Sequence, residues 1–390
     1  MSLAEPIALL DETASWRDLA IRSVTSSIID APTLRRHKLS NTEISCQNFV
    51  LVRVMLENGV EGYGEASTLG GPRWAEESVE SIKSVIDAYL APALVGRPAS
   101  CFEDNAIRLS KAASRNNAAK AAIEAATFDA VGKSLGLPAT ALLGGSVRTS
   151  FSVIWALASG DADQEIVEAK AKLERAEHRR FKIKMGFADP RMDIERLRKI
   201  RSALGADVEI IVDVNQAWSE ATAIRWLPAL EELDVSLIEQ PLPAAQMEQL
   251  ARIAARTPIP VMVDEAVFTT ADIARAGSFG AGSVISLKLV KSGGLLELKR
   301  AAAVASAFGM ELYGGCLLES GIGAAAHLAV FSTLPKMEWG TEHFGPKILV
   351  NDLVLSGPTY RNFEVHLPEG PGLGLILDED RIKHLTRTGA

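Results

Sequence analysis

The stretch Phe181-Lys182-Ile183-Lys184-Met185-Gly186 decides how the chain is interpreted. Apolar and charged residues alternate in it, and a period of two is typical of a β-strand with two unlike faces. Lys182 and Lys184 therefore share one face. Burying two ammonium groups is costly unless anions pair with them, so in isolation the pattern favours a solvated sheet edge, where lysines discourage aggregation. The rest of the chain has to decide between that edge and a functional site.

The composition is that of a globular protein with a large core. The chain has 390 residues, of which 47% are apolar and 23% charged, and this length suffices for two domains. Its formal net charge of −8 disfavours nucleic acid or an anionic membrane as a partner, but not a small anionic substrate. Cys46, Cys101 and Cys316 lack metal-ligand spacing and favour a reducing, cytoplasmic location. No apolar run of about 18 residues predicts a membrane span.

The first part of the chain predicts an α+β unit. Residues 1–18 lack the order of a signal peptide and are interpreted as an N-terminal extension. Within residues 19–145, helical spacing from Glu76 to Gly136 follows three strand candidates, the last two joined by the hairpin signal Asn58-Gly59. These candidates are Ile21–Asp30, Asn48–Glu57 and Val60–Ala66. The basic segment Arg35–Lys38 is expected to lie between the first two strands.

Residues 146–345 predict an α/β fold, because short β-branched runs alternate with amphipathic segments. The eight strand candidates are Phe151–Ala156, Phe181–Met185, Val208–Asp213, Val235–Glu239, Pro260–Asp264, Ser283–Leu289, Glu311–Tyr313 and Met337–Thr341. We expect a (β/α)8-type barrel. A doubly wound open sheet is the alternative, but Ser159–Asp163 is not a glycine-rich nucleotide fingerprint. The turn-rich segment 346–390 is expected to pack back on the first unit.

Three carboxylates occupy equivalent positions in three successive strand candidates, namely Asp213, Glu239 and Asp264. Barrel sites form at the carboxyl ends of the strands, so these groups should meet at one mouth. A hard cation, Mg²⁺ or Mn²⁺, would offset their mutual repulsion. Each acid alone could instead cap the following helix. Three in the same register favour a metal site.

Lysines flank this predicted metal site. Lys182 and Lys184 end the second strand, and Lys288 lies between apolar neighbours on the sixth. Positive charge from a metal and from neighbouring ammonium groups would depress a lysine pKa, so that the neutral amine can act as a base. The metal would hold a substrate carboxylate and take up the charge of an enolate.

This order of residues resembles the enolase superfamily, in which a lysine base works with Mg²⁺. Within that superfamily, the chain resembles the muconate lactonizing enzyme (muconate cycloisomerase) family over nearly its whole length. The most family-specific segments are Tyr313–Glu319 and Gly340–Pro346. Further similar segments are Leu34–Leu39, Ala91–Gly96, Trp155–Gly160, Asp213–Gln216 and Leu287–Gly294.

The resemblance implies a modified TIM barrel covered by a capping domain, to which the N-terminal unit and the C-terminal segment both contribute. By the same resemblance, the three carboxylates bind Mn²⁺ or Mg²⁺. Lys184 is then the acid/base, Lys182 helps to stabilise the enolate, and Lys288 faces the opposite side of the substrate. The family is also commonly homo-oligomeric, as an octamer or a dimer.

The resemblance implies further residues around that centre. Glu319, placed at the end of strand seven, matches an active-site glutamate of the family, and Asn215 is expected beside the metal or the substrate. His37, Arg73 and Trp74 lie in the expected capping loops that would select the substrate. Arg73-Trp74 departs from the family pattern, which leaves the exact substrate open.

The reaction implied is intramolecular and belongs to aromatic catabolism. One carboxylate of cis,cis-muconate adds to its own double bond, and a lysine protonates the resulting metal-held enolate to give muconolactone. Whether Lys184 or Lys288 delivers the proton depends on the substrate face presented, syn or anti. Chlorinated or methylated muconates are alternative substrates, because pocket shape separates such pairs by only about 1–3 kcal/mol.

Other activities fit the sequence less well. Dipeptide epimerases usually carry Asp-x-Asp where this chain has Thr341-Glu-His, and N-acylamino-acid racemases commonly carry Pro-Gly after Lys-x-Lys, where this chain has Met185-Gly186-Phe187. A mandelate-racemase-like enzyme needs a histidine at the end of strand seven, where the sequence places none. A Schiff-base aldolase would explain a barrel lysine but not three carboxylates. A non-catalytic metal-binding barrel is the remaining alternative.

Overall fold

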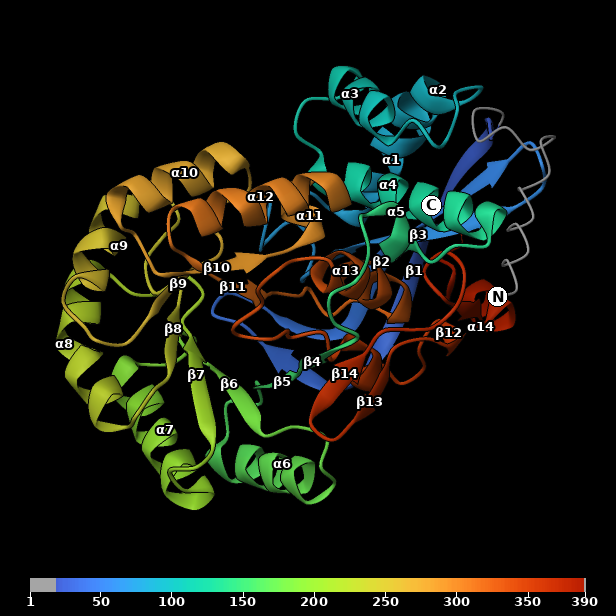
Figure 1. Ribbon diagram of the computed structural model, residues 1–390. Coiled ribbons are helices and arrows are strands. Elements are labelled where there is room, and N and C mark those ends of the chain that lie inside the picture. Colours follow the sequence, from blue (N-terminus) through green and yellow to red (C-terminus); the bar gives the residue numbers. More distant parts are fainter. Residues whose placement is uncertain (1–18, 389–390) are drawn as a thin grey trace, which may run out of the picture.

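Seven parallel strands follow one another in chain order through the computed structural model, which describes residues 19–388 (Figure 1). The predicted extension 1–18 lies outside the described residues. The spatial order is β11-β10-β9-β8-β7-β6-β5, as expected when each strand is followed by a crossover helix. The strands are β5 (Ile154–Leu157), β6 (Arg180–Lys184), β7 (Glu209–Asp213), β8 (Leu237–Glu239), β9 (Val261–Val263), β10 (Val284–Leu287) and β11 (Glu311–Gly314).

The sheet closes into a barrel without a regular eighth strand. The predicted strand Met337–Thr341 is reduced to one residue, Thr341, which bridges Val153 on one side and Gly314 on the other. Its N–H and C=O bond to Ser152 and Ile154, each at 2.9 Å. Gly340, with φ of +68°, interrupts the extended backbone just before this bridge. The barrel prediction is therefore confirmed, whereas the length of its last strand is wrong.

The first predicted barrel strand, Phe151–Ala156, is divided in two. β4 (Ser150–Ser152) pairs with a strand from the end of the chain, and only β5 pairs with β6. The predicted strand is divided because β4 belongs to a small sheet with β13 (Thr359–Arg361) and β14 (Glu364–His366), whereas β5 belongs to the barrel sheet.

Helices surround the barrel, and one of them, α13 (Gly321–Ser332), is buried along its whole length. Five of the helices begin with a side-chain cap, at Asp161, Asp189, Ser219, Thr269 and Ser320, residue types that accept hydrogen bonds from free helical N–H groups. The helices are α6 (Ala162–Glu174), α7 (Pro190–Leu204), α8 (Glu220–Glu232), α9 (Met247–Ala254), α10 (Thr270–Phe279), α11 (Leu289–Ser292), α12 (Leu295–Ala307) and α13 (Gly321–Ser332).

A three-stranded antiparallel sheet, called here the N-terminal sheet, precedes the barrel. It consists of β1 (Ile21–Lys38), β2 (Glu43–Leu56) and β3 (Glu61–Thr68). The predicted hairpin is present, with Gly59 at φ +83°. The segment Arg35–Lys38 is not a loop, however, because β1 continues through it after a register shift, and His37 pairs with Ile44.

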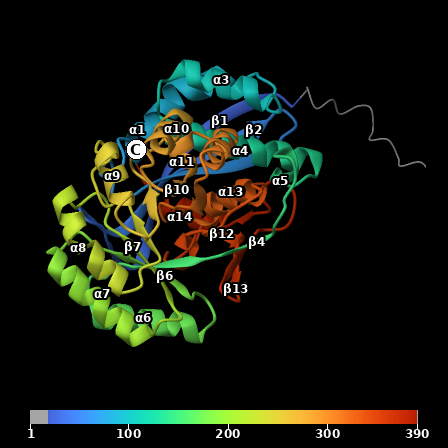
Figure 2. The same ribbon diagram turned by 60° about the vertical axis from the view of Figure 1, so that its left-hand side comes forward.

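Helices follow the N-terminal sheet in the chain, and one of them, α4 (Asn117–Leu135), packs closely on glycines of β3. They are α1 (Val79–Val85), the π-helical η2 (Ile86–Leu90), α2 (Ala91–Leu94), α3 (Phe102–Ala112), α4 (Asn117–Leu135) and α5 (Ala139–Leu142). A Cβ at Gly62 or Gly64 would lie 2.1 or 2.0 Å from backbone oxygens of α4. Close approach of the alanine-rich α4 to β3 therefore requires these glycines. In both views α1, α3 and α4 lie at the end of the molecule opposite α6 and α7 (Figures 1 and 2).

The last part of the chain touches both sheets. Its elements are the short 3₁₀ turn η3 (Gly345–Lys347), β12 (Val354–Ser356), β13 (Thr359–Arg361), β14 (Glu364–His366), β15 (Ile376–Leu377) and α14 (Glu379–Leu385). β14 pairs with β4, which directly precedes the barrel strand β5 in the chain, and Thr386 bridges Ile29 of β1. Among residues 19–388, none of the helices has both the length and the apolar character needed to cross a membrane.

Candidate active site

The two lysines of β6 point into the barrel and not into water. β6 pairs with β5 on one side and β7 on the other, so the sheet-edge interpretation is wrong. The exposed fractions of Lys182 and Lys184 are 0% and 6%. Inside the barrel, Ile154, Ile211, Leu237, Met262, Val284 and Tyr313 form a separate apolar cluster. Lys182 and Lys184 thus lie in a layer of charged side chains inside the barrel, next to this apolar cluster. The layer is called here the charged layer.

Strand register brings the predicted carboxylates to these lysines. Lys184 is aligned with Asp213, and Asp213 with Glu239, across three neighbouring strands. Asp264 is the first residue after β9, and Lys288 the first after β10. All three carboxylate side chains are buried. Because the strands are parallel, residues at equivalent positions meet at one end of the barrel.

Each carboxylate contacts a lysine. Lys184 Nζ lies 2.6 Å from Asp213 Oδ2 and Lys182 Nζ 2.5 Å from Glu239 Oε2. Lys288 Nζ donates to Asp264 Oδ2 at 2.5 Å. These contacts pair each of the three carboxylates with one of the three lysines, and the pairing of opposite charges compensates their desolvation.

The carboxylates reverse the expected effect on the lysine pKa values. Burial is the largest single cause and acts to lower the pKa of Lys184, but the combined attraction of Asp213, Glu342 and Glu239 outweighs it and the pKa is raised. For Lys182 the attraction of Glu239 and Glu342 likewise exceeds the effect of burial. The expected depression is therefore absent when the side chains act alone, and both lysines are held as ammonium groups able to donate a proton.

The three carboxylates are chemically suited to a divalent cation. Burial and then the repulsion of Asp213 raise the pKa of Glu239, as expected where anions crowd together. Glu239 Oε2 accepts no well-directed hydrogen bond from any described residue, although Lys182 Nζ is close. An oxygen-only donor set of this kind fits Mg²⁺ or Mn²⁺.

A second cluster, Glu319, His327 and His343, brings potential ligand atoms within 4.8 Å of one another. His327 is already engaged, since its Nε2 accepts from the Leu289 N–H at 3.0 Å and its Nδ1 lies 2.8 Å from Gly323 O. Both ring nitrogens are therefore used in hydrogen bonds and neither has a free lone pair for a metal. The carboxylates of Asp213, Glu239 and Asp264 offer the larger set of oxygen ligands.

Glu319 lies in a loop, not at a strand end as predicted. β11 ends at Gly314, and Glu319 directly precedes Ser320, the residue that caps α13. The Leu317 N–H lies 2.9 Å from both carboxylate oxygens of Glu319, and Ser67 Oγ lies 3.4 Å from one of them. Beside this loop, the Glu342 N–H donates to Gly314 O at the end of β11 at 2.8 Å.

The predicted capping-loop residues behave differently from one another. The Trp74 ring lies over Lys288, whose Nζ is 4.2 Å from the ring centroid. His37 is buried, and burial, followed by the charges of Arg35, Lys184 and Lys182, holds its pKa well below the usual value. Arg73 is exposed and its guanidinium donates to Thr42 Oγ1 at 2.7 Å. The structure thus brings Trp74 and His37 to the lysines, but not the side chain of Arg73.

Asn215 lies within the charged layer, as its sequence position suggests. Its Oδ1 lies 3.5 Å from Lys184 Nζ, and its amide donates to Glu265 Oε1 at 3.1 Å. Its N–H donates to Asp213 Oδ1 at 2.9 Å. Asn215 therefore helps to fix the orientation of the Asp213 carboxylate.

Sequence reasoning missed several members of this network. Glu342 lies 2.6 Å from Lys182 Nζ, and Lys291 Nζ donates to Asp264 Oδ1 at 2.8 Å. The Gln240 Oε1 accepts from the Asp264 N–H at 3.0 Å. One signal was available, because Glu342 follows the eighth strand position as the other carboxylates follow theirs. Lys291 and Gln240 gave no such signal, since they act from a helix and a loop.

Comparisons with known proteins agree with this geometry. Residues 23–144 match the family model described as mandelate racemase / muconate lactonizing enzyme, N-terminal domain, and residues 165–381 match enolase C-terminal domain-like. The chain is 44% identical to muconate cycloisomerase 1 of Pseudomonas putida, over 92% of this chain and 96% of the relative. It is 40% identical to a chloromuconate cycloisomerase of Pseudomonas sp. (strain P51), over 95% of this chain and 100% of the relative. Among solved structures, a muconate lactonizing enzyme from Pseudomonas fluorescens complexed with muconolactone superimposes with a TM-score of 0.93 at 42% identity, covering 95% of this chain and 100% of that chain.

Proposed function

Because the chain belongs to the mandelate racemase/muconate lactonizing enzyme family, we propose that it is a cycloisomerase that converts cis,cis-muconate to muconolactone. The observation that carries the proposal is the alignment of Lys184, Asp213 and Glu239 across three adjacent strands, with Lys288 on Asp264 completing the layer. That arrangement supplies proton donors and a site for a carboxylate substrate together.

Asp213, Glu239 and Asp264 would hold Mn²⁺ or Mg²⁺. When bound, the cation would neutralise negative charge that develops on the substrate carboxylate. The lysines would contribute in the same sense, because Lys182 is buried with its ammonium group in the charged layer.

The reaction needs one proton and no other reactant. A carboxylate oxygen of the substrate forms a C–O bond to the far double bond of its own chain, and the electron pair of that double bond moves toward the other carboxylate. A lysine ammonium, of Lys184 or Lys288, then gives its proton to the carbon next to that carboxylate. Solvent restores the lysine proton. Desolvation in the closed barrel favours proton transfer from a positioned donor over random protonation.

Chloromuconate is the second candidate substrate. It is supported by the 40% identity to a chloromuconate cycloisomerase, which is close to the 44% identity to a muconate cycloisomerase. The pocket wall that would distinguish the two substrates includes Trp74, whose ring lies against Lys288.

The test follows the ultraviolet absorbance of cis,cis-muconate, and in parallel of 2-chloromuconate, with purified protein and Mn²⁺. Loss of the diene absorbance, abolished by a chelator and restored by Mn²⁺, supports the proposal, and the larger kcat/KM identifies the substrate. If the absorbance stays constant with metal present, cycloisomerisation is wrong. Proton exchange of dipeptides or N-acylamino acids in deuterated water would then be measured, because the same layer could abstract a proton next to a carboxylate.

We further propose that the enzyme works in the cytoplasm as a homo-oligomer, with residues 19–145 and the C-terminal segment 346–390 covering a barrel of residues 146–345. Its three cysteines are unpaired, which is compatible with a reducing compartment. Light scattering of the purified protein gives the oligomeric state directly.

A further inference from the structure

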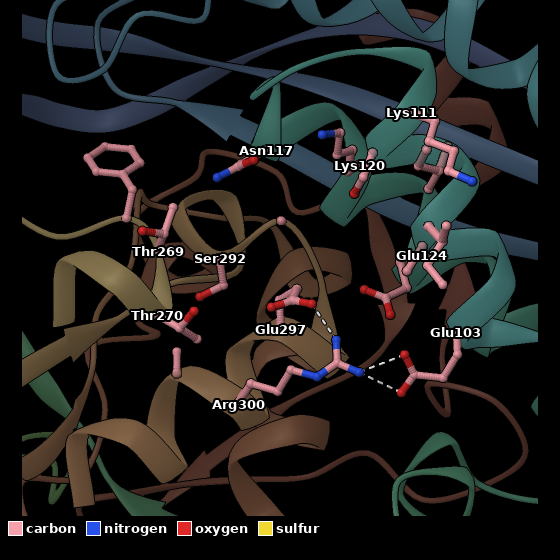
Figure 3. A pocket seen from close by; sticks show the side chains of 17 residues that line it. Glu103, Lys111, Asn117, Lys120, Glu124, Thr269, Thr270, Ser292, Glu297 and Arg300 are labelled. Atoms are coloured by element: carbon pink, nitrogen blue, oxygen red, sulfur yellow. Dashed lines mark hydrogen bonds and ion pairs between the residues drawn. The ribbon is translucent and has the colours of Figure 1, made fainter. Parts of the chain in front are cut away.

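A cavity of about 400 Å³ lies outside the charged layer, between the N-terminal helices and the barrel helices (Figure 3). Its walls come from α3 and α4 on one side, and from the start of α10, the α11–α12 turn and α12 on the other. A cavity of this size is in the range that small ligands occupy. None of the strand-end carboxylates or lysines lines it.

Two buried polar side chains one helical turn apart face this cavity from α4. Lys120 is 8% exposed and Glu124 is 7% exposed. Within residues 19–388, Glu124 Oε1 has no hydrogen-bond partner, although the same carboxyl group accepts from the N–H groups of Leu295 and Leu296 at the start of α12. The Lys120 ammonium interacts electrostatically with the Glu77 carboxylate. Leaving the buried Glu124 Oε1 without a hydrogen-bond partner is costly. A ligand that accepts from Lys120 and bonds to Glu124 would remove that cost.

The charges around the cavity favour an anion. Arg300 is engaged by Glu103 and Glu297, as the dashed lines in Figure 3 show. That leaves the ammonium groups of Lys120 and Lys111 to attract a ligand. Glu124 does not oppose an anion strongly, because burial raises its pKa to about 8 and its carboxyl group is largely protonated at neutral pH.

The remaining wall is apolar. Ile107, Ala106, Phe268 and Ala301 line the cavity beside these polar groups. A ligand that matches both kinds of wall has an anionic head and an apolar body. From the cavity, the unpartnered Glu124 Oε1 and the Lys120 ammonium beside it, we propose a second binding site here, for a small organic carboxylate held by Lys120 and Glu124.

This site adjoins the catalytic layer without belonging to it. Asn117 lines the cavity and its amide donates to Lys291 O at 2.6 Å. Lys291 in turn contacts Asp264. The cavity is therefore two residues away from the proposed metal site, but its occupation does not depend on the proposed reaction.

The experiment uses 4-bromobenzoate as the probe, with 4-bromobenzamide as its neutral counterpart. Anomalous diffraction from the bromine locates the probe in soaked crystals, and calorimetry measures its affinity in solution. We expect bromine density in the cavity with the benzoate and none with the benzamide. Lys120→Met should weaken that binding about tenfold or more, since a charge-assisted hydrogen bond contributes about 1.5–3 kcal/mol.

Lys170→Met is the matched control, because Lys170 is an exposed lysine of α6 remote from this cavity, and it should bind the probe as the unmodified protein does. Density only at the barrel mouth, equal binding of the benzamide, or unchanged affinity in Lys120→Met would each overturn the proposal. Turnover of muconate is not part of this readout, so failure of the proposed reaction would leave the result interpretable.

Discussion

Glu65 and Ser320 are separated by 255 residues, yet the carboxyl group of Glu65 accepts hydrogen bonds from both the N–H and the hydroxyl group of Ser320, the former at 3.0 Å. Glu65 belongs to β3 of the N-terminal sheet, and Ser320 caps α13 directly after Glu319. Gln47 of β2 forms a third hydrogen bond to this loop, since its amide donates to Leu317 O at 2.7 Å. The N-terminal sheet thus fixes the loop that carries Glu319.

This relationship predicts that Glu65 positions Glu319. Glu65→Ala should lower kcat about tenfold or more with little change in KM, because it leaves the donors of Ser320 unpaired at about 1–3 kcal/mol. Glu65→Gln keeps an acceptor oxygen and should retain most of the activity. Steady-state kinetics and circular dichroism of both variants test this. Equal losses in the two variants would contradict a role through hydrogen bonding.

The same residue predicts how stability depends on pH. Burial raises the pKa of Glu65 from 4.5 to about 8, so between these values the folded protein keeps a proton that the unfolded chain releases. The stability contribution is complete below pH 4.5 and is lost as pH rises through 8, by up to about 1.4 kcal/mol per pH unit.

Glu65→Gln removes this titration and should show a flatter fall in the free energy of unfolding between pH 6 and pH 8, measured with urea. Glu124, with a pKa also raised to about 8 by burial, provides a second variant, Glu124→Gln, expected to act in the same direction. A slope identical to that of the unmodified protein in both variants would show that neither group binds the proton.

The sequence predicted the charged layer because that layer obeys a local rule. Asp213, Glu239 and Lys184 each end a short apolar strand, and a parallel barrel brings such ends together. The alternation of residues around Lys182 is compatible with either a solvated sheet edge or a buried site. The carboxylates at the ends of the next three strands favoured the buried site.

What the sequence could not predict depends on contacts between distant segments. The eighth strand shrinks to Thr341 because closure needs only one bridging residue on each side. Glu319 enters the site through a loop held by Gln47 and Glu65, from another sheet. The sequence of residues 315–320 has no periodicity from which Gln47 and Glu65 could be predicted as partners. These contacts depend on how the loop lies against the N-terminal sheet in the folded protein.

Removal of one lysine should separate the two candidate proton donors. Lys184→Met is expected to lower kcat by about 10²–10⁴-fold, the usual contribution of a positioned acid or base, if Lys184 donates the proton. Lys288→Met would then have the smaller effect on kcat. In deuterated water, the product face that carries deuterium identifies the donor independently. Deuterium on the face of Lys288, with activity retained in Lys184→Met, would reverse the assignment.

Metal removal should abolish turnover without unfolding the protein. Asp213, Glu239 and Asp264 already pair with lysines, and these contacts compensate the buried charges when no cation is present. We expect a chelator to eliminate activity while the circular dichroism spectrum is unchanged, and Mn²⁺ or Mg²⁺ to restore it. Glu239→Gln should reduce metal content, measured by atomic emission. Full activity of the chelated protein would contradict the metal assignment.

Trp74 and Arg73 are adjacent in sequence, but we expect their substitution by alanine to affect the kinetics differently. The Trp74 ring lies 4.2 Å from Lys288 Nζ and 6.0 Å from the Phe268 ring, so it covers one side of the charged layer. Trp74→Ala should raise KM about tenfold and change the ratio of kcat/KM for muconate and 2-chloromuconate, because a cation–π contact contributes about 0.5–2 kcal/mol and apolar wall area is lost as well. Arg73→Ala is the matched control, since the Arg73 guanidinium bonds to Thr42 at the surface. It should leave KM and the ratio of kcat/KM for the two substrates unchanged. If Arg73→Ala shifts the substrate preference and Trp74→Ala does not, the sequence-based role of Arg73 holds and substrate selection lies at the rim, away from Lys288.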